Sequence, residues 1–291
     1  MSATGLHPLG AAPDAGQDDA EQLAFDNFQA GRRKSGLRRL ASNYGAAAGL
    51  FALSVVAWQV IVTVAGLPEY LLPVPSEVAS SLVDDWGNIL GPATLATLRE
   101  VLLGFLIATT LGIGIACVLH LFGPLRRAVY PLLIASQTIP VIVLAPILVV
   151  LFGFGILPKL IIVTLICFFP IVVNGLDGLS SVDDDYIRMM RTLDAGRWAI
   201  FRRVEFPAAL PLIFSGMRVA ATFASIGAVF GEWAGSNAGL GYVMLEAEPN
   251  LLTARMFSAI IILTVISTLL FGIVSLSQRL IAPWSRQEKA R

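Results

Sequence analysis

The sequence predicts an all-α integral membrane protein, a bundle of six transmembrane helices. Three observations support this fold class. Of the 291 residues, 56% are hydrophobic and only 14% are charged, with a mean hydropathy of +0.77, whereas soluble domains carry about a quarter charged residues. Six apolar runs reach the roughly 20 residues that a helix needs to cross the hydrocarbon core. Basic residues gather in alternate connecting segments, as the positive-inside rule describes.

The first 43 residues differ from the rest of the chain. They are small, acidic and rich in proline and glycine, so a disordered cytoplasmic tail is expected over residues 1–43. They lack the basic-then-apolar order of a signal peptide. The basic cluster at residues 32–39 is interpreted as a cytoplasmic anchor before the first span. A six-span domain over residues 44–284 and a cytoplasmic tail over residues 285–291 complete the predicted organisation.

The six predicted spans follow one another with short connections. The third and fourth form a helical hairpin, because only a tight turn at residues 153–155 separates them. Pro140 removes a backbone hydrogen bond and is expected to kink the third span. The spans cover about residues 45–65, 95–119, 129–152, 156–176, 213–232 and 255–282.

Small residues within the spans are expected to serve packing. In the second span Ala108, Gly112 and Ala116 recur at every fourth residue, which predicts a face for close helix contact. Cys117 and Cys167 both fall inside apolar runs. They are interpreted as packing residues, because two cysteines in such positions indicate neither a disulfide framework nor a metal site.

The distribution of basic residues predicts the orientation. With the N-terminus inside, the cytoplasmic segments hold 16 of the 20 Lys and Arg residues. Arg99, Lys159 and Arg255 fall at the outer side, and Arg218 lies near the inner end of the fifth span. An even number of spans returns the C-terminus to the inside, so both termini are expected to be cytoplasmic.

Motifs for catalysis and nucleotide binding are absent. The chain has no GxxxxGK[ST], HExxH or CxxC, so it is not expected to be an enzyme. Asp177 and Glu232 lie at span ends, where a carboxylate is expected to reach water, and no charge is expected within the spans. This absence favours a passive pathway driven by another protein. The alternative is an ion-coupled secondary transporter that works without an ATPase, and it would need an ion site that is not visible at mid-span.

Uncharged polar residues within the spans are candidates for a solute pathway. Gln137 precedes the expected kink and could face a solute, although it could equally bond a neighbouring helix. Glu232 at the end of the fifth span is included among the candidates. The remaining members are Thr138, Asn174, Thr222 and Ser225.

The longest polar segment lies between the fourth and fifth spans, at residues 177–212. Ser181 is expected to cap a helix with three aspartates in its first turns, which suit a helix N-terminus. A break at residues 194–196 precedes a second short helix, which Pro207 and Pro211 are expected to end. From the residues alone, this segment could also be a helical loop that packs under its own bundle. Its large apolar residues are Tyr186, Met189, Met190, Leu193, Trp198, Phe201 and Val204.

This segment resembles the cytoplasmic coupling ("EAA") motif of ABC importer permeases. The second half matches well, with Val204-Glu205-Phe206-Pro207 followed by Ala208-Ala209-Leu210-Pro211. The first half departs, because Arg188-Met189-Met190 stands where Glu-Ala-Ala is usual. Asp194 stands where glycine is usual, and Gly196 is expected to supply the turn instead.

The resemblance covers about residues 58–284. The runs LLPVPSEV, SQTIP, FFPIVVNGLDGL and GEWAGSNAGLGY look like the branch that imports nitrate, sulfonates, taurine and vitamin precursors. Within that branch the similarity of these runs favours the pyrimidine precursor of thiamine, or riboflavin, as the solute. The resemblance implies a type I ABC importer permease-like bundle with cytoplasmic coupling helices, in a bacterial inner membrane.

Partners and site residues are also implied by the resemblance. Two permease copies, as a homodimer, would form the pathway in the lipid bilayer and work by alternating access. A cytoplasmic ABC ATPase dimer would bind ATP and Mg, and an external solute-binding protein would deliver the solute. No cofactor, metal or nucleic acid is expected on this chain itself. Trp198, Phe201 and Val204 would anchor the ATPase, within a coupling loop that comprises Arg188, Met189, Met190, Asp194, Ala195, Gly196, Arg197, Trp198, Phe201, Arg202, Val204, Pro207 and Pro211.

Overall fold

A computed structural model of the chain describes residues 45–286. Within these residues every regular element is a helix and no strand occurs, which confirms the predicted all-α class. The tails predicted at residues 1–43 and 285–291 lie outside the described part, apart from residues 285 and 286. The chain divides after Ala65 into two units. In the first, the described part is one helix, Gly45–Ala65, which is long and apolar enough to cross a membrane.

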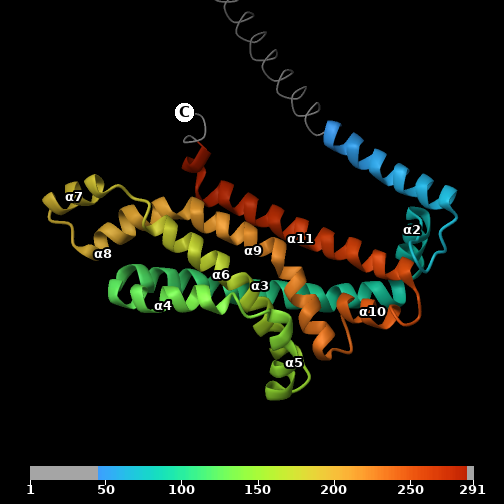
Figure 1. Ribbon diagram of the computed structural model, residues 1–291. Helices are drawn as coiled ribbons and strands as arrows, with labels where there is room; N and C mark the ends of the chain where they lie inside the picture. Colours follow the sequence, from blue (N-terminus) through green and yellow to red (C-terminus); the bar gives the residue numbers. More distant parts are fainter. Residues whose placement is uncertain (1–44, 287–291) are drawn as a thin grey trace, which may run out of the picture. The chain divides into compact units, whose positions relative to one another are not determined.

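The second unit contains four long apolar helices (Figure 1). They confirm the second, fourth, fifth and sixth predicted spans, with bounds that differ by several residues from those expected. Each exceeds the roughly 20 residues needed to cross the hydrocarbon core. They are α3 (Gly91–Leu121), α6 (Ile156–Leu179), α9 (Phe206–Gly235) and α11 (Thr253–Ile281).

The third predicted span is broken rather than kinked. Helices α4 (Gly123–Ser136) and α5 (Val141–Phe152) meet at an angle of 97° across a break of four residues (Figure 1). Pro140, which precedes α5, has no backbone N–H and favours an extended conformation in the residue before it. Counting the bent pair as one span gives six candidate spans within residues 45–286, which equals the predicted number. The hairpin turn into α6 forms as expected, with Gly153 at a φ of 77°.

The core is organised around α6, which packs against both α3 and α9. The predicted small-residue face on α3 is confirmed and extends to Gly104. A Cβ added there would lie 2.5 Å from Val163 Cγ1, and one added at Gly112 would lie 2.8 Å from Ile171 Cγ2. Because glycine has no side chain, the backbones of α3 and α6 approach closely at these positions, and no room is left for a larger residue.

Two groups of shorter helices lie at opposite ends of α9. Helix α10 (Leu240–Ala247) follows the end of α9 and packs on α9 and α11; α2 (Pro75–Asp84) packs on α11. We call this the α10 end. Helices α7 (Asp184–Thr192) and α8 (Arg197–Ile200) precede the start of α9, and we call this the α7 end. At the α10 end Arg255 donates two hydrogen bonds to Asp85, of 2.8 and 2.9 Å, which tie α11 to the end of α2.

Candidate functional site

The start of α7 is defined by an aspartate. The Asp183 carboxylate accepts a hydrogen bond of 2.9 Å from the Asp185 backbone N–H, which makes Asp183 the N-cap. The prediction that Ser181 caps this helix is wrong, because its hydroxyl donates to the Gly178 carbonyl and closes the last turn of α6. The acidic residues Asp184 and Asp185 occupy the first turn, where their negative charge interacts favourably with the positive end of the helix dipole.

The end of α7 is a Schellman motif with Asp194 in the position that usually holds glycine. Asp194 has a left-handed φ of 62°. Its N–H donates to the Arg191 carbonyl and the Ala195 N–H donates to the Met190 carbonyl, both at 3.1 Å, which are the two bonds that define the motif. The expectation that Gly196 supplies the turn is wrong, because Gly196 has a φ of −66° and precedes the first turn of α8.

The second short helix does not end at the prolines. Residues Arg197–Gly235 form one continuous helical stretch, in which a π-helical turn at Phe201–Glu205 joins α8 to α9. Pro207 lies in the first turn of α9 and Pro211 lies inside it. A proline in a first helical turn sacrifices no hydrogen bond, and Pro211 removes one without breaking the helix. Helix α8 is therefore continuous with the fifth span.

The apolar residues of this segment divide into buried and exposed groups. Phe201 is 6% exposed, stacks on Trp198 at a centroid distance of 5.3 Å and belongs to the same buried hydrophobic cluster as Leu119 and Val172. The prediction that Phe201 is an anchor for a partner is wrong, because its own bundle covers it. Val204 is half-buried. Trp198 itself is 63% exposed.

An exposed apolar surface remains at the α7 end. Tyr186, Met189, Leu193 and Trp198 are all more than half exposed, and Met190 is half-buried. Arginines surround them, and we call these four side chains with their arginines the α7 surface. The arginines are Arg188, Arg191, Arg197, Arg202 and Arg203, all exposed.

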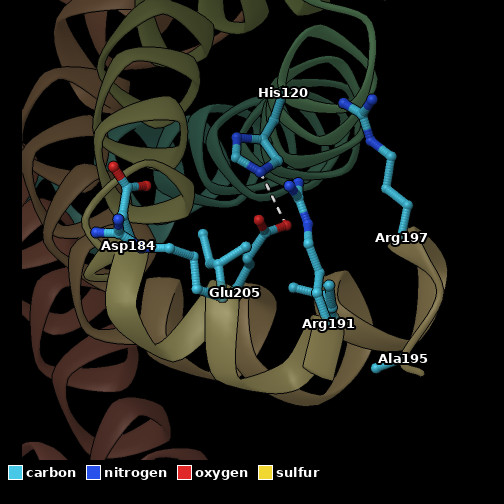
Figure 2. A pocket seen from close by; sticks show the side chains of 9 residues that line it. His120, Asp184, Arg191, Ala195, Arg197 and Glu205 are labelled. Atoms are coloured by element: carbon cyan, nitrogen blue, oxygen red, sulfur yellow. Dashed lines mark hydrogen bonds and ion pairs between the residues drawn. The ribbon is translucent and has the colours of Figure 1, made fainter. Parts of the chain in front are cut away.

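A cavity of about 560 Å³ adjoins this surface and shares Arg188, Arg191 and Arg197 with it. Figure 2 shows Arg191 and Glu205 reaching toward His120, which comes from the end of α3. His120 Nε2 lies 2.9 Å from Glu205 Oε2, and Arg197 donates to the Leu121 carbonyl. These contacts fasten α8 and the π-helical turn to α3. The cavity is lined by His120, Asp184, Ile187, Arg188, Arg191, Ala195, Arg197, Ile200 and Glu205.

The α10 end contains buried charges that the sequence did not lead us to expect. Glu100, Lys159 and Glu232 are 3%, 8% and 0% exposed. The prediction that Glu232 reaches water is wrong, and so is the prediction that the spans contain no charge. Lys159 Nζ donates to Glu100 Oε1 and to Ser236 Oγ, both at 2.6 Å. These bonds link α3, α6 and the loop that follows α9.

Glu232 is enclosed by the start of α10. It accepts hydrogen bonds from the Thr97 hydroxyl at 2.6 Å and from the Gly241 N–H. The Leu240 N–H donates to Thr97 Oγ1 at 2.8 Å, so two of the free N–H groups of the α10 N-terminus are satisfied. Gly239 has a φ of 115°, and a Cβ there would lie 2.1 Å from Glu232 Oε1. We call Thr97, Glu100, Lys159 and Glu232 the buried network.

The predicted pathway residues separate into three places. Thr222 and Ser225 line a groove of about 410 Å³ between α9 and α11. Gln137 and Thr138 lie in the break between α4 and α5, both exposed. Asn174 donates to the Pro170 carbonyl of its own helix. The groove is also lined by Trp233, Met244, Thr264, Ser267 and Thr268, among others.

A metal site is not indicated in residues 45–286, where no group of three or more His, Cys, Asp or Glu side chains could hold an ion. Over the same residues Cys117 and Cys167 are both free.

Comparison with known proteins identifies relatives across most of the chain. The family model described as "Binding-protein-dependent transport system inner membrane component" matches residues 108–287. The formylaminopyrimidine transport permease protein of Halalkalibacterium halodurans is 36% identical over 82% of this chain and 95% of its own length. The riboflavin transport system permease protein of Chloroflexus aurantiacus is 35% identical over 80% of this chain and 87% of its own length.

More distant similarities agree with these. The putative aliphatic sulfonates transport permease protein of Bacillus subtilis is 29% identical over 91% of this chain and 96% of its own length. An inward-facing structure of the MetNI methionine ABC transporter shares the fold, with a TM-score of 0.59 and 18% identity over 66% of this chain and 96% of that chain. The named relatives are permeases and not enzymes, which agrees with the prediction that this chain is a transport subunit.

Proposed function

The chain belongs to the family of binding-protein-dependent transport system inner membrane components, as a permease subunit of an ABC importer for a small solute, and we propose that the α7 surface couples it to an ATPase. The single observation that carries this proposal is the exposure of Tyr186, Met189, Leu193 and Trp198. Apolar patches of this kind, rimmed by polar groups, mark protein interaction sites.

The proposed partner is a cytoplasmic ABC ATPase dimer that binds ATP and Mg. Trp198 would be the central anchor and the five arginines the polar rim, because interface energy concentrates in a few aromatic residues while rim charges govern association rate and specificity. The continuous helix from Arg197 to Gly235 supports this role. A push on α8 would be transmitted directly into the fifth span, which is what alternating access requires.

The proposed orientation follows the positive-inside rule. The α7 end carries the exposed arginines, whereas Arg255 at the α10 end is paired with Asp85. Cytoplasmic loops carry an excess of Lys and Arg, so we place the α7 end and both termini in the cytoplasm. The α10 end then faces outward in a bacterial inner membrane, toward an external solute-binding protein.

The solute pathway is proposed to run past the α4–α5 break and along the groove between α9 and α11. Non-helical backbone at membrane depth is tolerated only where it is buried in protein or lines a water-filled cavity. Gln137 and Thr138 lie in this break and are exposed, so they fit a water-filled path or its contact with a second copy. A homodimer would supply the opposite wall.

The chemistry of the groove favours a neutral solute that donates hydrogen bonds. The Thr222 hydroxyl donates to the Val219 carbonyl at 2.7 Å and the Thr264 hydroxyl donates to the Ile260 carbonyl at 2.9 Å. Each hydroxyl oxygen therefore has its lone pairs left to accept bonds from a solute. Lys and Arg are absent from the groove lining, so an anion finds no counter-charge there.

The relatives support the same solute class. We propose the pyrimidine precursor of thiamine, or riboflavin, as the cargo, in agreement with the relatives named for formylaminopyrimidine and riboflavin. Alkyl sulfonates and nitrate are anions and taurine is a zwitterion, so each carries a negative group that has no counter-charge in the groove, and each fits it less well. An uptake assay with all of these compounds, in vesicles that contain the full transporter, tests the choice.

The coupling role is tested by Trp198→Ala in a complex reconstituted with the ATPase and the solute-binding protein. Because Trp198 is 63% exposed, the variant should enter the membrane normally. The stimulation of ATP hydrolysis by loaded binding protein should fall at least tenfold, since a central anchor contributes 2 kcal/mol or more, about a factor of 30. Phe154→Ala is the matched control, because Phe154 is also exposed but lies in the α5–α6 turn. Full stimulation in Trp198→Ala would refute the assignment.

The alternative is an ion-coupled secondary transporter, and the buried network is the observation that favours it. Charges inside membrane spans often mark ion pathways. Uptake by the purified permease alone, driven by an ion gradient without ATP, would establish this alternative.

A further inference from the structure

The buried network contains more negative than positive charge. Glu100 on α3 and Glu232 on α9 contribute two carboxyl groups, and Lys159 on α6 contributes one ammonium. Of the neighbouring ionisable groups, Arg99 and Glu246 are exposed and Tyr242 on α10 is half-buried. A net charge left in a dry interior is costly, and proteins relieve that cost by pairing the group or by changing its protonation.

One oxygen of the network has no donor. Glu100 Oε1 accepts from Lys159, but Glu100 Oε2 is buried without a hydrogen-bond partner. Glu232 already accepts from Thr97 and from Gly241, and its charge is close enough to interact with that of Glu100. A proton on either carboxyl would remove the excess charge and would provide a donor between the two groups.

The buried network also contacts the residues that form one end of the proposed solute groove. The Gly241 N–H donates to Glu232, and the Gly241 carbonyl accepts from the Trp233 indole at 3.0 Å. Trp233 and Met244 both line the groove. The position of α10, and with it the shape of this end of the groove, therefore depends on Glu232 and Thr97.

We infer that the carboxyl pair of Glu100 and Glu232 holds a single proton, and that the buried network positions α10 and Trp233 at the end of the groove. The part that concerns the groove rests on the proposed function, whereas the proton and the position of α10 do not. The four residues act through α10 and are positioning residues. A glutamine at position 100 mimics the protonated carboxyl, because its amide oxygen can accept from Lys159 and its NH₂ group can donate to the carboxylate of Glu232.

The proton is tested by infrared spectroscopy of the full chain in nanodiscs at neutral pH. The wild-type protein should show one carbonyl stretching band of a protonated carboxyl. Glu100→Gln and Glu232→Gln should each lose it, because the remaining carboxylate is then balanced by Lys159. No band in the wild type would mean that both carboxylates are ionised, with a bound cation to balance the second charge, and would overturn the inference. A band that survives in either glutamine variant would equally overturn a shared proton.

The positioning role is tested by Thr97→Val, which keeps the shape of the side chain and removes its bonds to Glu232 and Leu240. Hydrogen exchange at the backbone amides of residues 240–243 should become at least tenfold faster than in the wild type. Glu100→Gln should remain within a few-fold of the wild type, because it leaves the bonds from Thr97 and Gly241 to Glu232 in place. Unchanged exchange in Thr97→Val would overturn this part.

Transport measurements separate this inference from the proposed function. In the reconstituted importer Thr97→Val should raise the apparent KM for the solute at least fivefold and leave the maximal rate within twofold, whereas Glu100→Gln should have a nearly normal KM. If the wild type shows no ATP-driven uptake, the proposed function fails, whereas the infrared and exchange results still decide the inference. If the wild type transports and Thr97→Val has a normal KM, the groove part of the inference fails alone.

Discussion

The two ends of the helical unit treat charge in opposite ways. At the α10 end Glu100, Lys159 and Glu232 are buried and bonded to one another or to the chain around them. At the α7 end charged side chains such as Arg188 and Arg202 are exposed, and large apolar side chains lie exposed among them. The α10 end bonds most of its buried polar groups within the chain, with Glu100 Oε2 as an exception, whereas the α7 end keeps charged and apolar side chains together on an exposed surface. The exposed arginines around the apolar side chains therefore distinguish the α7 end as the surface that we propose for the ATPase.

The comparison predicts that substitutions at the α10 end act on stability, and the largest effect is expected for Lys159→Met. Removal of the ammonium leaves two buried carboxyls without a counter-charge and should lower the free energy of unfolding by about 3–5 kcal/mol. Denaturant unfolding in detergent measures this. The double variant Lys159→Met with Glu100→Met should recover at least half of the loss, because replacing both members of a buried pair is often nearly neutral. Additive losses would contradict a paired network.

Two stacked aromatic residues at the α7 end should respond differently from each other. Phe201→Ala should lower the free energy of unfolding by about 3 kcal/mol, because it leaves a cavity in the core. Trp198→Ala should cost less than about 1 kcal/mol, since the side chain is exposed. Thermal unfolding of the two variants side by side measures the difference. Equal losses would mean that the α7 surface also serves the stability of the bundle.

Acid should weaken the contact between α2 and α11 at the α10 end. The two hydrogen bonds from Arg255 hold the pKa of Asp85 below its usual range, against an opposing effect of burial. A lowered pKa in the folded state stabilises the protein above the unfolded value of about 3.9, and the stabilisation is lost as the pH falls through the folded value. The unfolding temperature of the wild type should therefore fall toward that of Asp85→Asn below about pH 4. A constant difference between the two proteins down to pH 2 would contradict the lowered pKa.

The smallest effect is expected for Asp194→Gly in the turn after α7. The left-handed conformation costs an L-residue roughly 1 kcal/mol that glycine does not incur, so the variant should be more stable by up to that amount. Gly196→Ala is the control. It should change stability by less than about 0.5 kcal/mol, because Gly196 has a negative φ and no atom within 4 Å of an added Cβ. Lower stability in Asp194→Gly would show that the aspartate makes a favourable interaction of its own.

The sequence was sufficient to predict most of the helices, because a continuous apolar run of spanning length has few alternatives in lipid. The packing face on α3 was predictable for a similar reason, since small residues at every fourth position have one common use in membranes. The position of the break at Pro140 was predicted correctly, but the angle between the two helices was not. A proline removes one hydrogen bond, and the resulting angle depends on the contacts made by the two halves.

The buried network could not be predicted from position along the chain. Glu100, Lys159 and Glu232 lie near the ends of three different spans, where a single helix would let them reach water. Their burial results from the way the loop after α9 and the start of α10 fold over them. The one local signal was the pair Gly239 and Gly241 shortly after Glu232, because glycines are needed where another group approaches the backbone.

The caps and turns at the α7 end were predicted only in part. Ser181 and Asp183 are equally good N-cap residues by type, and hydrogen bonding to α6 decided between them. The exposed and buried aromatic residues of α8 could not be distinguished either, because Trp198 and Phe201 are three residues apart and lie on neighbouring parts of the helix surface.

The turn after α7 has a consequence for finding related chains. What the turn requires is a residue with a positive φ, and Asp194 meets that requirement with a side chain. Aspartate and asparagine are the residues that most often replace glycine in such a conformation. A search pattern that accepts only the letter G at this position will pass over chains such as this one, whereas a pattern that accepts G, N or D, or that tests backbone handedness, will retain them.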